Sequence, residues 1–363
     1  MGVQGQKSGE TLYAVQYLRA FAALAVFYYH ISATVHSTWS QAVVKVDAVG
    51  AAGVDLFFVI SGFIMAHIVA RAPAFDMRDF ALRRIVRVAP IYWLVTLFVF
   101  ALALASPSLF GSTRADPLQL LHSLLFVPYG VGDHTTGPVL LVGWTLNYEM
   151  FFYAVVAITA GLFGDRSLLI ASYVLMALAA IGLNFDPQNG YLAFYTDPIL
   201  LEFVLGIACH HIWQRTRNNA GSIVFPVLLV AGVALLFLQF ERAAGEGRVI
   251  YWGVPAAMIL LGALHAVRIE NEWLRRFGDW SYALYLTHLF VVMAFIKLVV
   301  PRVGFLDLDW KLWYAIMTVV ALAGAGLTYT LIERPMTRWL NRKLVAPVPP
   351  VDEPKAISNA SPF

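Results

Sequence analysis

Arg19 and His30 are the two residues whose types and spacing point most directly to chemistry. They lie eleven positions apart in the first long apolar stretch, residues 12–35. If this stretch is an α-helix, eleven steps return to within about 20° of the same face, and the two side chains lie about 16 Å apart along the axis. One face then carries a cation and an imidazole, and an imidazole titrates near neutral pH, as a general base requires.

Four further ionisable residues lie within long apolar stretches, namely Asp55, Glu149, Glu202 and His288. Ionisable groups at membrane depth are costly, and they usually face the interior of a helix bundle or a water-filled cavity. By default they indicate function. A structural role stays open for each, because a carboxylate can pair with Arg19 or cap a discontinuous helix, and His30 can be a hydrogen-bonded packing residue.

The composition predicts an integral membrane protein that consists of helices. Hydrophobic residues make up 60% of the chain and charged residues 13%, and the mean hydropathy is +0.71. These values lie far outside the range of soluble domains. We expect an all-α bundle of about ten transmembrane helices. The apolar stretches are 12–35, 50–70, 88–105, 140–162, 167–184, 196–213, 221–240, 249–266, 279–300 and 310–332.

The distribution of basic residues predicts the orientation in the membrane. With the N-terminus inside, most of the 25 Lys and Arg residues fall between stretches on the cytoplasmic side, where such residues are in excess. Both termini are therefore expected in the cytoplasm. The net charge of +3 marks one side of the membrane rather than one binding surface, so we expect no nucleic-acid partner.

The rest of the chain predicts one membrane domain, residues 1–343, and a disordered cytoplasmic tail, residues 344–363. The tail is rich in proline and poor in aromatic residues. No metal site is expected. Cys209 is the lone cysteine, and the adjacent His210 and His211 would point about 100° apart on a helix, which makes them poor joint ligands.

Three arginines crowd the start of the third apolar stretch, in the segment RRIVRVAPIYW, residues 83–93. Arg83, Arg84 and Arg87 lie within about one helical turn, and Arg334 follows the last stretch on the same side of the membrane. Guanidinium groups bind phosphates through paired hydrogen bonds. The alternative is that these arginines are ordinary anchors that contact lipid headgroups on the cytoplasmic side.

These segments together resemble the acyltransferase 3 family of membrane O-acyltransferases, which modify bacterial polysaccharides. The similarity runs from about residue 11 to 340. The matching segments are QYLRAFAALAVFYYH with its Arg, ten residues, His signature, GVDLFFVISGF, RRIVRVAPIYW, WTLNYEMFFY, GDWSYALYLTH and IERP. We expect a short form without the extracytoplasmic domain of some members, similar to the exopolysaccharide-modifying branch. The resemblance implies a multi-pass protein of the bacterial inner membrane.

The resemblance also implies transfer of an acyl group, commonly acetyl, from cytoplasmic acyl-CoA to a sugar hydroxyl. The acyl-CoA is a co-substrate, and the acceptor, the acyl group and the oligomeric state stay open. Arg19 and His30 inherit the essential signature. In one hypothesis, His30 is a general base whose ring is oriented by Asp55 or Glu149. In the other, His30 itself receives the acyl group and passes it on.

Further site residues follow from these hypotheses. Arg19 stabilises the thioester, a phosphate or a neighbouring glutamate. The phosphates of CoA are expected at Arg83, Arg84, Arg87 and Arg334. His288 is a further catalytic candidate, and Asn147 and Tyr285, near Glu149 and His288 in sequence, are candidates for binding the carbohydrate acceptor.

A secondary transporter or flippase is the strongest alternative, because it too would bury His and carboxylate groups along a polar path. Transporter folds commonly contain repeated halves. The first five and the last five apolar stretches share no such pattern.

Overall fold

The computed structural model describes residues 12–39, 49–72, 74–106, 115–131, 134–219, 221–239, 247–303 and 310–345. All the candidate site residues lie within these ranges. Of the predicted tail, only residues 344 and 345 are described.

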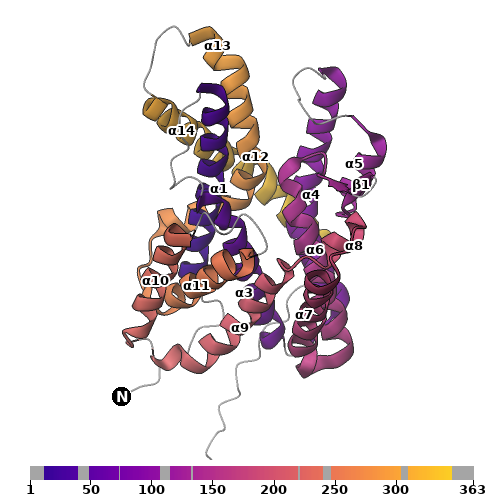
Figure 1. The fold of residues 1–363 in the computed structure, drawn as a ribbon, viewed down its shortest axis with the longest axis vertical. Helices are drawn as coiled ribbons and strands as arrows, with labels where there is room; N and C mark the ends of the chain where they lie inside the picture. Colours follow the sequence, from indigo (N-terminus) through magenta and orange to yellow (C-terminus); the bar gives the residue numbers. More distant parts are fainter. Residues whose placement is uncertain are drawn as a thin grey trace, which may run out of the picture.

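The described chain is built from helices and one short hairpin (Figure 1). Long apolar runs favour helices in a membrane, because a helix satisfies its backbone hydrogen bonds within one segment. The two strands of the hairpin, β1 (Tyr129–Val131) and β2 (His134–Thr136), pair antiparallel. The helices are α1 (Tyr13–Trp39), η1 (Gly50–Ala52), α3 (Gly53–Arg71), α4 (Met77–Ala105), α5 (Pro117–Leu124), η3 (Leu141–Gly143), α6 (Trp144–Phe163), η4 (Gly164–Arg166), α7 (Ser167–Phe185), α8 (Gly190–Tyr195), α9 (Leu200–Thr216), η5 (Arg217–Asn219), α10 (Val224–Gln239), η7 (Val249–Gly253), α11 (Val254–Ala266), α12 (Glu272–Ala294), η8 (Phe295–Val299), α13 (Val300–Val303), α14 (Trp310–Thr328), η10 (Tyr329–Glu333) and α15 (Arg334–Leu344).

Seven helical stretches of the described chain are long and apolar enough to cross a membrane. One of them, Leu141–Phe185, joins α6 and α7 and so covers two of the predicted ranges. A helix lies over each of the ten predicted ranges. The all-α membrane architecture is therefore confirmed, whereas ten crossings and cytoplasmic termini stay predictions.

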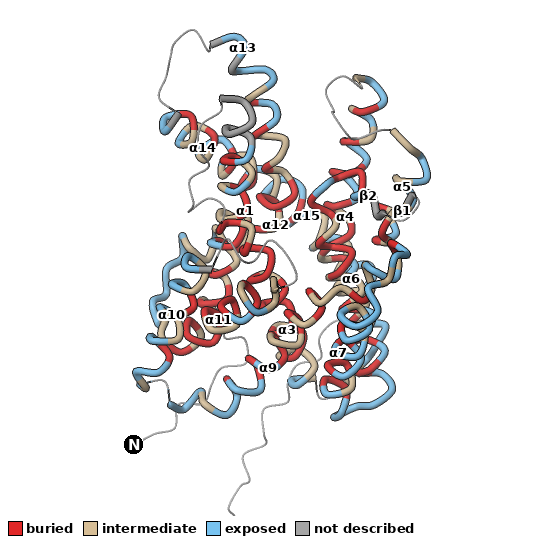
Figure 2. The backbone as a smooth tube through the Cα atoms, in the orientation of Figure 1, coloured by how far each residue is buried: buried red, intermediate tan, exposed pale blue. Residues whose placement is uncertain are grey.

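The outer surface of the bundle is apolar, as contact with lipid requires. In Figure 2, α7 and α10 carry long exposed segments, whereas α3 is largely buried. The exposed positions include Phe185 and Leu238, whose side chains are 77% and 79% exposed. Exposed apolar surface on this scale marks contact with a membrane or with another protein.

Helices α3 and α9 cross at very short range in the centre of the bundle, and two glycines make this possible. A Cβ atom at Gly62 would lie 2.2 Å from the carbonyl oxygen of Phe203, and one at Gly206 would lie 2.1 Å from that of Val59. Small residues at helix crossings let backbones approach closely in membrane proteins. This crossing holds α3, which carries Asp55 and Ser61, at a fixed depth against α9.

We expect Gly206→Ala to lower the stability of the protein by about 2 kcal/mol, because overpacking against a backbone atom forces the two helices apart. Thermal unfolding of the detergent-solubilised protein measures this. Gly324→Ala in α14 is the matched control, since a Cβ there meets nothing within 4 Å. Equal midpoints for the two variants would contradict the crossing.

Candidate active site

His30 and His288 form a hydrogen-bonded pair between α1 and α12. The Nδ1 atom of His30 lies 3.2 Å from Nε2 of His288, and the ring centroids are 4.9 Å apart. The two residues are 258 positions apart in sequence, and the packing of α1 along α12 brings them together. His288 is buried, whereas His30 is partly exposed.

The hydrogen-bond partners assign the protons of both rings. Nδ1 of His288 lies 2.8 Å and 3.1 Å from the carbonyl oxygens of Tyr285 and Leu284. Nδ1 of His30 lies 2.9 Å from the carbonyl oxygen of Val26. A carbonyl oxygen only accepts, so both Nδ1 atoms carry a proton. His288 Nε2 then accepts from the same His30 Nδ1–H that the Val26 carbonyl oxygen accepts from, so this one N–H is shared between two acceptors. In the neutral ring, His30 Nε2 holds the lone pair that a general base needs.

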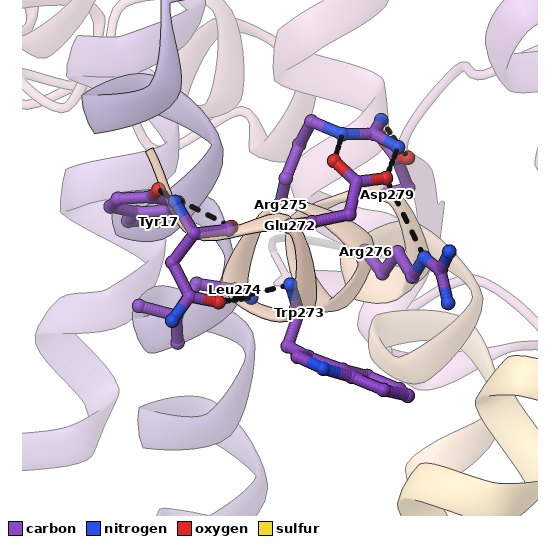
Figure 3. A network of polar contacts seen from close by, with 8 residues as sticks. Tyr17, Glu272, Trp273, Leu274, Arg275, Arg276 and Asp279 are labelled. Atoms are coloured by element: carbon purple, nitrogen blue, oxygen red, sulfur yellow. Dashed lines mark hydrogen bonds and ion pairs between the residues drawn. The ribbon is translucent and has the colours of Figure 1, made fainter. Parts of the chain in front are cut away.

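A network at the start of α12 fixes this helix against α1 (Figure 3). The Tyr17 hydroxyl on α1 donates to the carbonyl oxygen of Ile269, at 2.8 Å, and accepts from the backbone N–H of Asn271. The Asn271 side chain caps α12 by accepting from the N–H groups of Trp273 and Leu274. Arg275 pairs with Glu272 and Asp279 within the first two turns. The register of His288 against His30 depends on this junction.

A cavity of about 130 Å³ lies between α1, α3, α4, α6 and α12. Its polar lining includes Arg19, Ser61, Arg84, Arg87, Thr145, Glu149, Tyr153, Tyr282 and Tyr285. The structure therefore brings Arg19 together with two of the predicted phosphate-binding arginines, one carboxylate candidate and one acceptor candidate.

The cavity has an excess of positive charge. Arg19, Arg84 and Arg87 line it, and Glu149 is the carboxylate among its lining residues. Glu149 accepts hydrogen bonds from the hydroxyls of Tyr153 and Ser61. Nε of Arg84 is buried and has no hydrogen-bond partner in the described part of the chain. A buried, cationic lining of this kind favours an anionic ligand or developing negative charge.

Tyr285 connects the cavity to the imidazole pair. Its hydroxyl shares a hydrogen bond with Thr145, at 2.7 Å, and its ring centroid lies 6.1 Å from that of His288. His30 and His288 are themselves absent from the cavity lining. Arg19 and His30 thus share a helix, but the structure places one aromatic side chain between the cavity and the pair.

Arg83 and Arg334 do not line the cavity, contrary to the expectation that four arginines act together. Arg83 pairs with Asp79 one turn earlier, at 2.6 Å. From α4 the cavity is lined by Arg84, Arg87 and Val88, whereas the guanidinium of Arg83, four positions before Arg87, is held by Asp79. Arg334 lies on α15, beyond the end of η10.

The structure gives Asp55 a different partner from the one expected. Both its carboxylate oxygens accept hydrogen bonds of 2.9 Å from Arg248, and the side chain is fully buried. The ring of His30 is oriented in the described structure by His288 and Val26, rather than by Asp55 or Glu149. Glu202, on α9, is also fully buried, and neither of its oxygens has a hydrogen-bond partner among the described residues.

Sequence reasoning missed Arg248 and Glu333. Arg248 immediately precedes the π-helical turn η7 and packs against the rings of Trp252 and Trp144, at 5.0 and 6.0 Å. Glu333 ends the π-helical turn η10 and accepts a 2.8 Å bond from Arg87. Each is a charged residue at the edge of an apolar stretch, and this is the sequence feature that could have identified it. The sequence does not show which residue it pairs with.

Of the two acceptor candidates, only Tyr285 lines the cavity. Asn147 is buried on α6, and its Oδ1 atom has no hydrogen-bond partner within the described ranges. Among the described residues, no group of three or more His, Cys, Asp or Glu side chains is arranged to hold a metal ion.

Comparison with known proteins decides the family. Residues 12–330 match the model of the acyltransferase 3 family, described as an acyltransferase domain. The chain belongs to this family. It is 34% identical to the exopolysaccharide production protein ExoZ of Rhizobium meliloti (strain 1021) over 307 residues, which cover 80% of this chain and 90% of ExoZ.

More distant relatives carry related names. The acyltransferase MdmB of Streptomyces mycarofaciens is 26% identical, over 94% of this chain and 97% of MdmB. The putative peptidoglycan O-acetyltransferase YrhL of Bacillus subtilis (strain 168) is 25% identical, over 88% of this chain and 54% of YrhL. No solved structure matches. The resemblance to the acyltransferase 3 family is confirmed, and this family member is a multi-pass membrane protein related to O-acetyltransferases.

Breaking the Asp55–Arg248 pair should destabilise the protein. We expect Asp55→Asn to cost about 3 kcal/mol, because it leaves a guanidinium without its buried counter-charge. Asp55→Asn combined with Arg248→Gln should recover part of the loss, since it removes the guanidinium that the single variant leaves without its carboxylate partner. Thermal unfolding of the wild type, Asp55→Asn, Arg248→Gln and the double variant is the measurement, and a double variant that loses as much stability as the two single variants together would contradict the pairing.

Proposed function

We propose that this protein transfers an acyl group, acetyl in the simplest case, from cytoplasmic acyl-CoA to a hydroxyl of a carbohydrate acceptor. The acceptor class is an exopolysaccharide or its lipid-linked precursor, in keeping with the name of ExoZ. The bacterial inner membrane is the proposed location. The observation that carries the proposal is the His30–His288 pair, one aromatic ring away from a cationic cavity.

The direct mechanism starts at Nε2 of His30. This atom takes the proton of the acceptor hydroxyl while the oxygen attacks the thioester carbonyl. The new ester bond forms, the carbon–sulfur bond breaks, and His30 returns the proton to the departing thiolate of CoA. His288 accepts from His30 Nδ1–H throughout and so holds the ring in the tautomer that has its lone pair at Nε2. His288 thus orients the His30 ring, as a carboxylate does in hydrolytic triads.

An acyl-His30 intermediate is the alternative within the same activity. Nε2 would then attack the thioester itself, and the carbon–sulfur bond would break to release the thiolate of CoA. In a second step the acceptor oxygen would attack the acyl carbon, the carbon–nitrogen bond would break, and the hydroxyl proton would leave, which balances the thiolate of the first step. The same lone pair serves both routes. They differ in whether free CoA is released before the acceptor binds.

We assign the donor to the cavity. Arg84 and Arg87 are the proposed phosphate ligands, and Arg19, which the structure places beside them, is proposed to stabilise a phosphate or the thioester oxygen. Glu149 is held by Tyr153 and Ser61 and balances part of this charge. Transport remains the rival function in principle, but no specific observation favours it over the family's acyl transfer.

Replacing His30 with Ala should abolish acyl transfer, with a loss of at least about 100-fold, because it removes the general base of one route and the nucleophile of the other. His288→Ala should retain a measurable fraction, since it removes the orienting partner and keeps the base. The measurement is transfer from labelled acetyl-CoA to cell-surface glycan in membranes that contain equal amounts of each variant. Substantial activity in His30→Ala would refute both routes.

Arg84→Gln and Arg87→Gln should each raise KM for acyl-CoA by about tenfold, since each removes a charge-assisted hydrogen bond to the donor. Arg83→Gln is the matched control, because it removes the same charge from the same helical turn outside the cavity lining. Steady-state kinetics with the acceptor held constant is the test. A KM that rises as much for Arg83→Gln as for the other two would remove the donor from this cavity.

A further inference from the structure

Helix α15 carries a stripe of arginines that the catalytic site does not use. Arg334, Arg338 and Arg342 recur at every fourth position, so they lie along one face of the helix. Met336, Leu340 and Leu344 recur in the same way on the opposite face. Met336 packs against the core, and α15 contacts α4. The apolar face is thus turned partly to the protein, whereas the three arginines are exposed.

The stripe lines a groove of about 330 Å³. The lining residues are Thr330, Arg334, Pro335, Arg338, Trp339 and Arg342. Helix α15 contains no acidic residue, and the described structure gives these three arginines no ion pair. A groove with this much positive charge and no internal counter-charge fits an anion with several oxygen acceptors, and phosphate is the group that arginine binds best.

Apolar side chains beside the groove indicate where the anion comes from. Leu331, next to Thr330 of the groove, is 69% exposed, and Trp339, which lines the groove, is 59% exposed. Helix α15 also ends the apolar stretch Lys311–Leu344, which is long enough to cross a membrane. A basic face next to exposed Leu and Trp side chains is typical of a helix that lies in the headgroup layer. There, anionic lipids attract clustered arginines.

We propose that this groove binds the phosphate headgroups of anionic phospholipids. The groove and the donor cavity share no lining residue, so the two anion sites are separate. They are nevertheless adjacent along the chain. Glu333 holds Arg87 of the donor cavity, and the next residue, Arg334, lines the groove. A lipid that fixes the position of α15 therefore also helps to fix the position of Arg87.

The experiment is native mass spectrometry of the purified full-length protein in detergent, with phosphatidylglycerol and phosphatidylcholine of identical acyl chains. We expect the wild type to retain phosphatidylglycerol about tenfold better than phosphatidylcholine, and Arg338→Gln/Arg342→Gln to lose most of that preference. Lys343→Gln is the matched control, since it removes a basic charge from the same helix outside the groove. It should keep the preference.

Two results would overturn the proposal. One is an unchanged preference in Arg338→Gln/Arg342→Gln, provided that its thermal midpoint equals that of the wild type. The other is release of the retained phosphatidylglycerol by millimolar inorganic phosphate or CoA, which would assign the groove to soluble anions. Neither outcome depends on acyl transfer, so the proposed function and the lipid site can fail independently.

Discussion

The hydrogen bond between His30 and His288 is the interaction on which the proposed chemistry depends. It requires α1 and α12 to lie in one register, and the junction of Tyr17 with Asn271 fixes that register at the start of α12. Because Nδ1–H of His288 donates to backbone carbonyl oxygens, its Nε2 is a hydrogen-bond acceptor that faces His30. The lone pair of His30 is thereby directed to Nε2. The packing of α1 against α12 and the carbonyl contacts of His288 thus prepare His30 as a base.

Two buried ion pairs neutralise part of the charge inside the bundle, and the cavity keeps an excess of positive charge. Asp55 pairs with Arg248 and Glu333 with Arg87, and each pair joins helices that are about 200 residues or more apart in sequence. A π-helical turn adjoins Arg248 and another contains Glu333. Such turns insert a residue into a helix and re-aim the side chains around it, and they are frequent at functional sites. Arg19 and Arg84 have no such buried ion pair in the described structure, so their charge is available to the cavity.

Sequence alone predicts the membrane class, the helices and the shared face of Arg19 and His30, because these follow from hydrophobicity and from the period of one helix. It also points to His288, since a histidine in an apolar stretch needs a partner. It does not predict that the partner is His30, nor that Asp55 pairs with Arg248. Those pairings depend on how helices distant in sequence pack, and on local π-turns such as η7 and η10. The sequence also does not show that Asp79 holds Arg83 while Arg84 and Arg87 line the cavity.

The protonation state of the imidazole pair is the most direct test of this account. Solid-state ¹⁵N NMR of the histidine-labelled protein in lipid, with His30 and His288 assigned by single substitution, reports which nitrogen of each ring carries a proton. The account predicts protonated Nδ1 and unprotonated Nε2 in both neutral rings, with a coupling across the hydrogen bond between His30 Nδ1 and His288 Nε2. A neutral His30 with its proton on Nε2, and no coupling to His288, would contradict it.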